Sequence, residues 1–136
     1  MADISQTAAN VAAGSSTTRV QLVQAGEAIT QGQPVYLASD GKYYQTDAND
    51  TAVKAQAKGV AVSPASTDGY FLMAVDGLIN LGATLAVGQV YVVSATKGAI
   101  APYGDLTTND YVTILGVATT TALLDINILV SGVQKP

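Results

Sequence analysis

From residue 19 onward, short segments of mainly apolar residues are separated by turn residues; residues 19–24 partly alternate between polar and apolar, and a period of two residues is typical of β-strands. The alternation is clear in the last segment, where Ile126, Ile128 and Val130 share one face and Leu129 lies on the other. Clusters of Gly, Pro, Asp and Ser separate the segments, as expected of turns. The predicted strands span residues 19–24, 34–38, 42–46, 58–63, 69–75, 78–81, 90–94, 99–102, 111–118 and 123–130.

Turn residues connect several of these segments. Residues 39–41, Ser-Asp-Gly, separate the second and third predicted strands and suit a tight hairpin. Residues 64–68 separate the fourth and fifth strands, and Asp76-Gly77 ends the fifth. Short strands with turns at this spacing predict an all-β barrel or sandwich.

The two halves of the chain carry the same landmarks in the same order. In each half, Gly-Gln precedes a strand with a tyrosine, a Gly-Val-Ala triplet follows, and a second glycine closes the unit. We therefore predict two quasi-repeated β units, residues 20–77 and 78–133, packed together as a single β domain of residues 19–136. The matched pairs, at offsets of 55 to 57 residues, are Gly32 with Gly88, Tyr36 with Tyr91, Gly59 with Gly116, and Gly77 with Gly132.

Residues 1–18 differ from the rest, since they are mainly Ala, Ser, Thr, Gln and Asn with one charge, Asp3. Ile4 and Val11 are the larger apolar side chains after Met1. A short helix ending at Gly14 is compatible with this composition, and so is a disordered tail. Because an ordered segment with little to bury needs a surface to bind, we expect an extended N-terminal arm that lies along a partner protein or a neighbouring subunit.

Composition excludes several classes of function. The 136 residues suffice for one domain, and only 12% of them are charged. There is no Cys and no His, which removes disulfides, thiolate chemistry and the commonest general base. The net charge of −4 and six scattered basic residues argue against nucleic-acid binding. We expect no membrane segment, since the apolar runs are short, and synthesis in a cytoplasm, since no secretory signal is present.

Candidate catalytic and metal-binding groups are few. Residues 47–51, Asp-Ala-Asn-Asp-Thr, place oxygen atoms at alternate positions as calcium loops do, but Ala52 and Lys58 stand where an EF-hand needs Gly and Glu. Glu27 is the only glutamate, and no histidine can activate a serine. A Ser–Lys dyad stays formally open, although nothing in the sequence places a lysine near a suitable serine. We predict a protein that is not an enzyme and has no catalytic residue, cofactor or metal site.

Short motifs in the first unit resemble those of the tailed-bacteriophage head decoration proteins, also called capsid cement proteins. The similar stretches are Gly-Gln-Pro-Val-Tyr-Leu at 32–37, Asp-Gly-Lys at 40–42, Lys-Gly-Val-Ala at 58–61 and Val-Asp-Gly-Leu at 75–78. The resemblance implies a small β protein on the outer surface of the virion head. It also implies contact with the major capsid protein and N-terminal segments that touch the shell. The family commonly forms homotrimers and sometimes dimers or monomers.

Two other functions remain open. A tail-fibre or spike adhesin module would also be β-rich and poor in charge, and it would carry a sugar-binding cleft or receptor loops. A barrel-sandwich carrier domain would need a modifiable lysine at a tight hairpin, and Lys42 and Lys97 are the nearest approximations. Loops 64–69 and 101–110 occupy corresponding places in the two units and are candidate binding loops. The residues that we expect at a capsid or oligomer interface are Ile4, Val11, Ser15, Thr17, Arg19, Pro64 and Tyr103.

Overall fold

The computed structural model describes residues 3–136, and nearly all of its regular structure is β. Three single-turn 3-10 helices accompany the strands in these residues: η1 (Ala8–Asn10), η2 (Val53–Ala55) and η3 (Tyr103–Asp105). The strands are β1 (Val11–Ala13), β2 (Arg19–Gln24), β3 (Pro34–Leu37), β4 (Tyr43–Gln45), β5 (Ala57–Ala61), β6 (Tyr70–Leu81), β7 (Val90–Val93), β8 (Ile100–Pro102), β9 (Tyr111–Ala118) and β10 (Leu123–Gln134).

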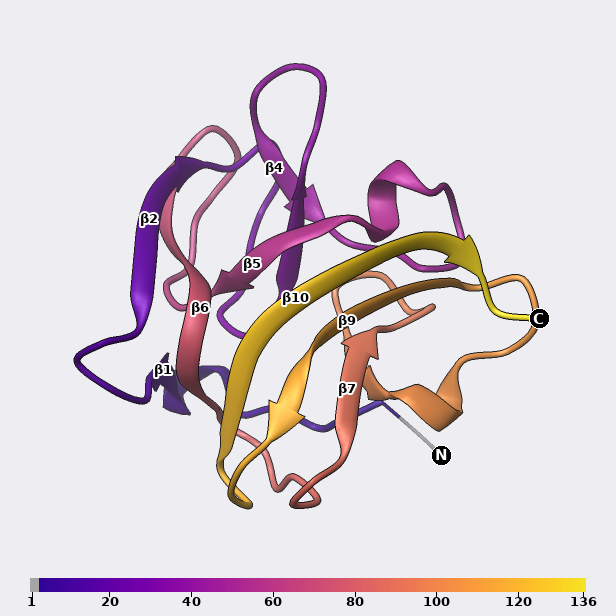
Figure 1. Cartoon of the computed structure of the whole chain (residues 1–136). Coiled ribbons are helices and arrows are strands. Elements are labelled where there is room, and N and C mark those ends of the chain that lie inside the picture. Colours follow the sequence, from indigo (N-terminus) through magenta and orange to yellow (C-terminus); the bar gives the residue numbers. More distant parts are fainter. Residues whose placement is uncertain (1–2) are drawn as a thin grey trace.

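The two predicted units form two halves of one curled antiparallel sheet (Figure 1). The strand order is β4-β3-β5-β6-β10-β9-β7-β8, so both halves have the same internal order from the outer edge to the centre. The halves join where β6 pairs antiparallel with β10. The predicted all-β fold of two quasi-repeated units is therefore confirmed.

Matching irregularities in the two halves support this equivalence. In the first half, Val35 pairs with Gly59 and a bulge follows. In the second half, Tyr91 pairs with Gly116 and a bulge follows at the same place. A Cβ atom at Gly59 would collide with the Ala74 carbonyl oxygen, and one at Gly116 would collide with the carbonyl oxygen of Asp125. Both glycines thus permit the same close approach of the next strand.

Two of the predicted residue matches are wrong in register. By strand pairing, Tyr91 corresponds to Val35, so the two tyrosines differ by one position. Gly77 lies within β6, opposite Ile126 of β10, whereas Gly132 lies near the far end of β10. The chain also does not break at Gly77, because its positive φ of 95° lets β6 continue as one strand through a bulge beside β2.

The N-terminal arm is part of the domain's own sheet. Val11–Ala13 forms β1, which pairs with the second half of β6, and no helix ends at Gly14. The Ile4 N–H donates to the Ile100 carbonyl oxygen at 3.0 Å, and the Thr7 N–H donates to that of Gly82 at 2.7 Å. The partner surface expected from a neighbouring subunit is therefore supplied by the same chain, because β6 offers an open edge there.

Apolar side chains gather in two clusters under the curled sheet. The larger cluster lies mainly under the second unit and includes Ile79, Leu115 and Leu124. The smaller cluster lies under the first unit, where Phe71 and Met73 are fully buried. This arrangement leaves the opposite face of the first half of β6 and its neighbour β2 outside the core.

Candidate functional site

The seven residues predicted at an interface are distributed over distant parts of the domain. Val11 is buried, and the half-buried Ile4 packs against the larger core cluster. Both side chains therefore stabilise the fold within one chain and are not available to a partner in this structure. The prediction of a contact through Ile4 and Val11 is corrected accordingly, because β1 docks on β6 with its apolar side chain inward.

Ser15 and Thr17 lie between β1 and β2, and Arg19 is the first residue of β2. The hydroxyl oxygens of Ser15 and Thr17 are 3.0 Å apart, and the Thr17 N–H donates to Ser15 Oγ at 3.2 Å. The exposed guanidinium of Arg19 donates from Nη1 to Asp76 Oδ2 at 3.2 Å. These three residues form a polar turn at the start of the exposed strand β2.

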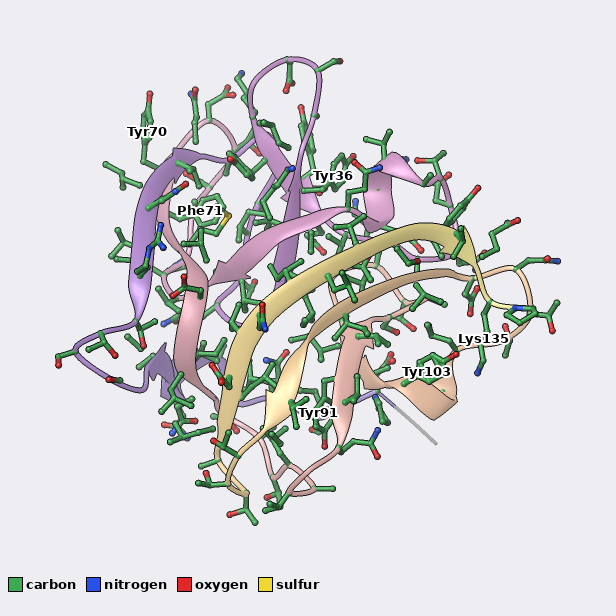
Figure 2. The ribbon with its side chains drawn as sticks, in the orientation of Figure 1. Tyr36, Tyr70, Phe71, Tyr91, Tyr103 and Lys135 are labelled. Atoms are coloured by element: carbon green, nitrogen blue, oxygen red, sulfur yellow. The ribbon has the colours of Figure 1, made fainter. Side chains whose placement is uncertain are left out.

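Pro64 and Tyr103 are exposed but belong to different regions. Pro64 lies in the loop between β5 and β6. Tyr103 begins η3, and the Lys135 ammonium lies 4.7 Å from the centre of its ring. Figure 2 shows Tyr103 and Lys135 together on one side of the molecule and Tyr70 on the opposite side. The structure therefore gathers three of the seven predicted residues, and not the other four.

A contiguous apolar surface crosses β2 and the first half of β6. It consists of Val20, Leu22, Tyr70 and Leu72, and we call it the β2 patch; all four residues are exposed. Leu22 lies directly opposite Leu72 in the strand pairing, while Val20 and Tyr70 are each two residues away on the same face. Leu22 is 67% exposed, which is a large exposure for a leucine on a strand.

β2 has only one apolar side chain toward the core, Val23, which packs against the smaller core cluster. Its leucine faces solvent, while the side chain of Gln21 is opposite the buried Met73. Arg19–Asp76 at one end and Lys42–Asp68 at the other give the patch a charged rim, with the Lys42 Nζ to Asp68 Oδ1 distance at 2.6 Å. An apolar centre with a polar rim is the usual anatomy of a protein interface.

A second exposed region lies along the end of β10. Beyond Ile126, the strand pairs with β9 and no longer with β6. Leu129, Val130 and Val133 are exposed there, and no charged residue occurs from Asn127 to Gln134. We call residues 127–134 the β10 edge. Figure 1 shows it at the opposite side of the molecule from β2.

One polar cavity is lined mainly by residues of the first unit, with Lys97 contributed by the second. It has a volume of about 350 Å³, and Tyr36, Tyr44 and Asp47 are among its lining residues. The Tyr44 hydroxyl donates to Asp40 Oδ2 at 2.6 Å, and this bond lowers the pKa of the Asp40 carboxyl and raises the pKa of Tyr44 to about 12. Among residues 3–136, no group of three or more acidic side chains is placed to hold a metal ion.

The lysines considered for a carrier function are held in ion pairs. Lys97 Nζ lies 2.8 Å from Glu27 Oε1, and Lys42 is paired with Asp68 as described above. The ion pair with Asp68 raises the pKa of Lys42, first through the hydrogen bond and then through the charge. Neither lysine projects freely from a hairpin as a modifiable carrier lysine would.

Comparison of the chain with protein-family models gave no match, and comparisons with curated proteins and with solved structures gave none either. In the described part of the chain, no helix is long and apolar enough to cross a membrane.

Sequence reasoning missed the β2 patch and the β10 edge as surfaces. The segment Val-Gln-Leu-Val-Gln at 20–24 only partly alternates, and its pattern does not say which face is inward. For β10, Val130 was expected to share a face with Ile126, whereas Ile126 is buried and Val130 is exposed. Ile128 still packs against the larger core cluster, whereas Leu129 and Val130 beyond the bulge are both exposed, and a bulge leaves little trace in sequence.

Proposed function

We propose that this chain is a structural virion protein that binds the outer surface of a tailed-phage head and cements neighbouring major capsid subunits. The observation that carries the proposal is the pair of exposed surfaces, the β2 patch and the β10 edge, on opposite sides of one small domain. A bridging protein needs at least two separate contact surfaces, whereas an isolated β domain usually protects such edges with charges or prolines. The motif resemblance to decoration proteins supplies the identity of the partner.

The β2 patch is the surface that we assign to the major capsid protein. Its apolar residues would be buried against the shell, and the Arg19 and Lys42 ion pairs would remain at the solvated rim. The outer edge of β2 also offers unpaired backbone groups, so a strand or arm of the capsid protein can add to it. The predicted polar residues Ser15, Thr17 and Arg19 adjoin this contact.

The β10 edge is the surface that we assign to a second copy of the chain. We propose that the β10 edge of one copy contacts a different face of the next copy. Such a contact is heterologous, and heterologous contacts can close a ring, as a homotrimer requires. The lack of charge at the β10 edge means that association desolvates no ionised group. The proposed particle location is the outside of the shell, and no enzymatic activity is part of the proposal.

Binding to heads that lack the protein tests this assignment. Val20→Lys places a charge within the β2 patch and should weaken binding of the chain to heads at least about tenfold, because burying an unpaired ammonium group costs free energy. Val87→Lys is the matched control, since Val87 is 64% exposed in a loop outside both surfaces. Equal binding by both folded variants would contradict the role of the β2 patch.

The adhesin alternative predicts a different location. A tail-fibre module would be found in purified tails and not on filled heads. Quantification of the chain in separated heads and tails by mass spectrometry distinguishes the two functions, and recovery with tails alone would reject the cement proposal.

A further inference from the structure

The N-terminal segment lies along one side of β6 in two pieces, β1 and β2 (Figure 1). β1 pairs with residues 79–81 of β6, and β2 pairs with residues 70–76. Between the two pieces, residues 15–18 form a turn that is closed by the Thr18 N–H, which donates to the Ser15 carbonyl oxygen at 3.2 Å. In the described part of the chain, no strand pairs with the other side of either piece.

The two pieces differ in how well this outer edge is protected. β1 has only three residues, and the Val11 carbonyl oxygen accepts a hydrogen bond from Gln31 Nε2 at 3.4 Å. β2 has six residues, and none of residues 20–24 is charged or a proline. Since charges and prolines are the usual protection of an exposed edge, β2 is the piece that can accept another strand.

The hydrogen bonds of Leu72 in β6 show how the backbone of Leu22 is oriented. The Leu72 carbonyl oxygen accepts from the Val62 N–H at 2.9 Å, and the Leu72 N–H donates to Ser63 Oγ at 2.8 Å. Leu72 therefore directs both backbone groups away from its partner Leu22, as in the non-hydrogen-bonded kind of antiparallel pair. In such a pair both residues point away from each other, so the N–H and carbonyl of Leu22 point out from the open edge.

The same alternation extends along β2. Just after the strand, the N–H and the carbonyl of Ala25 both bond to residues 68–69, which places Ala25 among the residues that face β6. By alternation, Val20, Leu22 and Gln24 present their N–H and carbonyl groups outwards. The side chains of Val20 and Leu22 are also exposed, so the open backbone groups and the β2 patch lie on the same strand.

We propose that β2 accepts, as an added strand, an extended segment of the major capsid protein that is centred on Leu22. This inference rests on the proposed function, since it specifies how the β2 patch contacts the shell. The segment matches the six residues of β2 in length, because the polar turn at 15–18 ends the open edge. It carries apolar side chains on alternate residues, which pack on the β2 patch while its backbone pairs with β2.

Hydrogen exchange of the full-length chain, free and bound to heads that lack it, tests the proposal. In the free chain, the Leu22 amide should exchange quickly, and the Val23 amide, which faces β6, should exchange slowly. Binding to heads should slow exchange of the Leu22 amide at least about tenfold, because the added strand accepts its hydrogen bond. The Val23 amide is the internal control and should stay slow in both states.

Leu22→Pro and Leu22→Ala separate strand addition from side-chain contact. Both substitutions remove most of the leucine side chain, but only proline removes the outward N–H, and an edge strand tolerates that loss. Leu22→Pro should therefore bind heads about threefold to tenfold more weakly than Leu22→Ala, the value of one neutral hydrogen bond. Urea denaturation of both variants checks that the domain stays folded.

Equal head binding by the two folded variants, or unchanged exchange of the Leu22 amide on heads, would overturn strand addition. If both variants still bound more weakly than the unaltered chain, the β2 patch would keep its proposed role without strand addition. If Leu22→Pro did not fold, the exchange measurement would decide alone. Protection of the Leu22 amide that rises with the concentration of the free chain would identify a second copy as the added strand and would also overturn the proposal. Absence of head binding by the unaltered chain would reject the proposed function itself, and this inference with it.

Discussion

Gly116 in β9 lies where the backbone of β10 approaches most closely. Any side chain there would meet the Asp125 carbonyl oxygen, which cannot move without disturbing the pairing of β9 with β10. Gly88 is glycine for a different reason, because its φ is 83° but the space around it is open. An alanine at Gly116 would therefore test the effect of a steric collision, and an alanine at Gly88 the effect of backbone strain alone.

Gly116→Ala should lower the free energy of unfolding by about 3 kcal/mol, toward the upper end of the usual cost of overpacking. Gly88→Ala should cost about 1 kcal/mol, which is the cost of a left-handed alanine. Urea denaturation of the two variants measures both values. If Gly116→Ala lowered the free energy of unfolding less than Gly88→Ala, β10 would be able to move away from the added methyl group.

The Tyr44–Asp40 bond predicts an unusual titration. The bond favours ionised Asp40 and protonated Tyr44, so its contribution to stability is complete between the usual pKa values of the two groups. It is lost as pH falls through the lowered pKa of Asp40 and as pH rises through the pKa of Tyr44, about 12. The difference in tyrosinate absorbance between the unaltered chain and Asp40→Asn should isolate the titration of Tyr44, whose pKa should return toward about 10 in the variant. A late titration that persists in Asp40→Asn would contradict this assignment.

At the scale of elements, β1 behaves as an integral strand. Val11 is 2% exposed, so Val11→Ala should destabilise the domain by about 2 kcal/mol through lost burial and the cavity that remains. The exposed Val87→Ala is the control and should change stability by less than about 0.5 kcal/mol. Equal unfolding midpoints for both variants would mean that β1 does not stay docked in solution.

Most strands were predictable because turn residues bound short runs rich in aromatic and β-branched residues, as in β3, β4 and β9. Three features were not. The fusion of 69–75 and 78–81 into β6 depends on a glycine that can either turn or continue a strand, according to its neighbours. The docking of β1 depends on an edge more than sixty residues away in sequence. The cavity at Tyr36 depends on Lys97 of the other unit, which no local pattern connects to Glu27.

At the scale of the whole molecule, the β10 edge predicts self-association. Val133 is 61% exposed and Val87 is 64% exposed, so Val133→Lys and Val87→Lys introduce the same charge at equally exposed valines. Sedimentation should show an oligomer, with the mass of a trimer, for the unaltered chain and Val87→Lys, and smaller species for Val133→Lys. If all three proteins sediment as monomers, or all as one oligomer, the β10 edge is not the contact between copies.

The most direct test of the cement proposal is a cryo-EM map of the intact particle at a resolution that shows strands. We predict density for this domain on the outside of the head, with the β2 patch against the major capsid protein and each oligomer in contact with more than one capsid subunit. Density for the domain only in the tail, or on the head with the β2 patch facing solvent, would contradict the account.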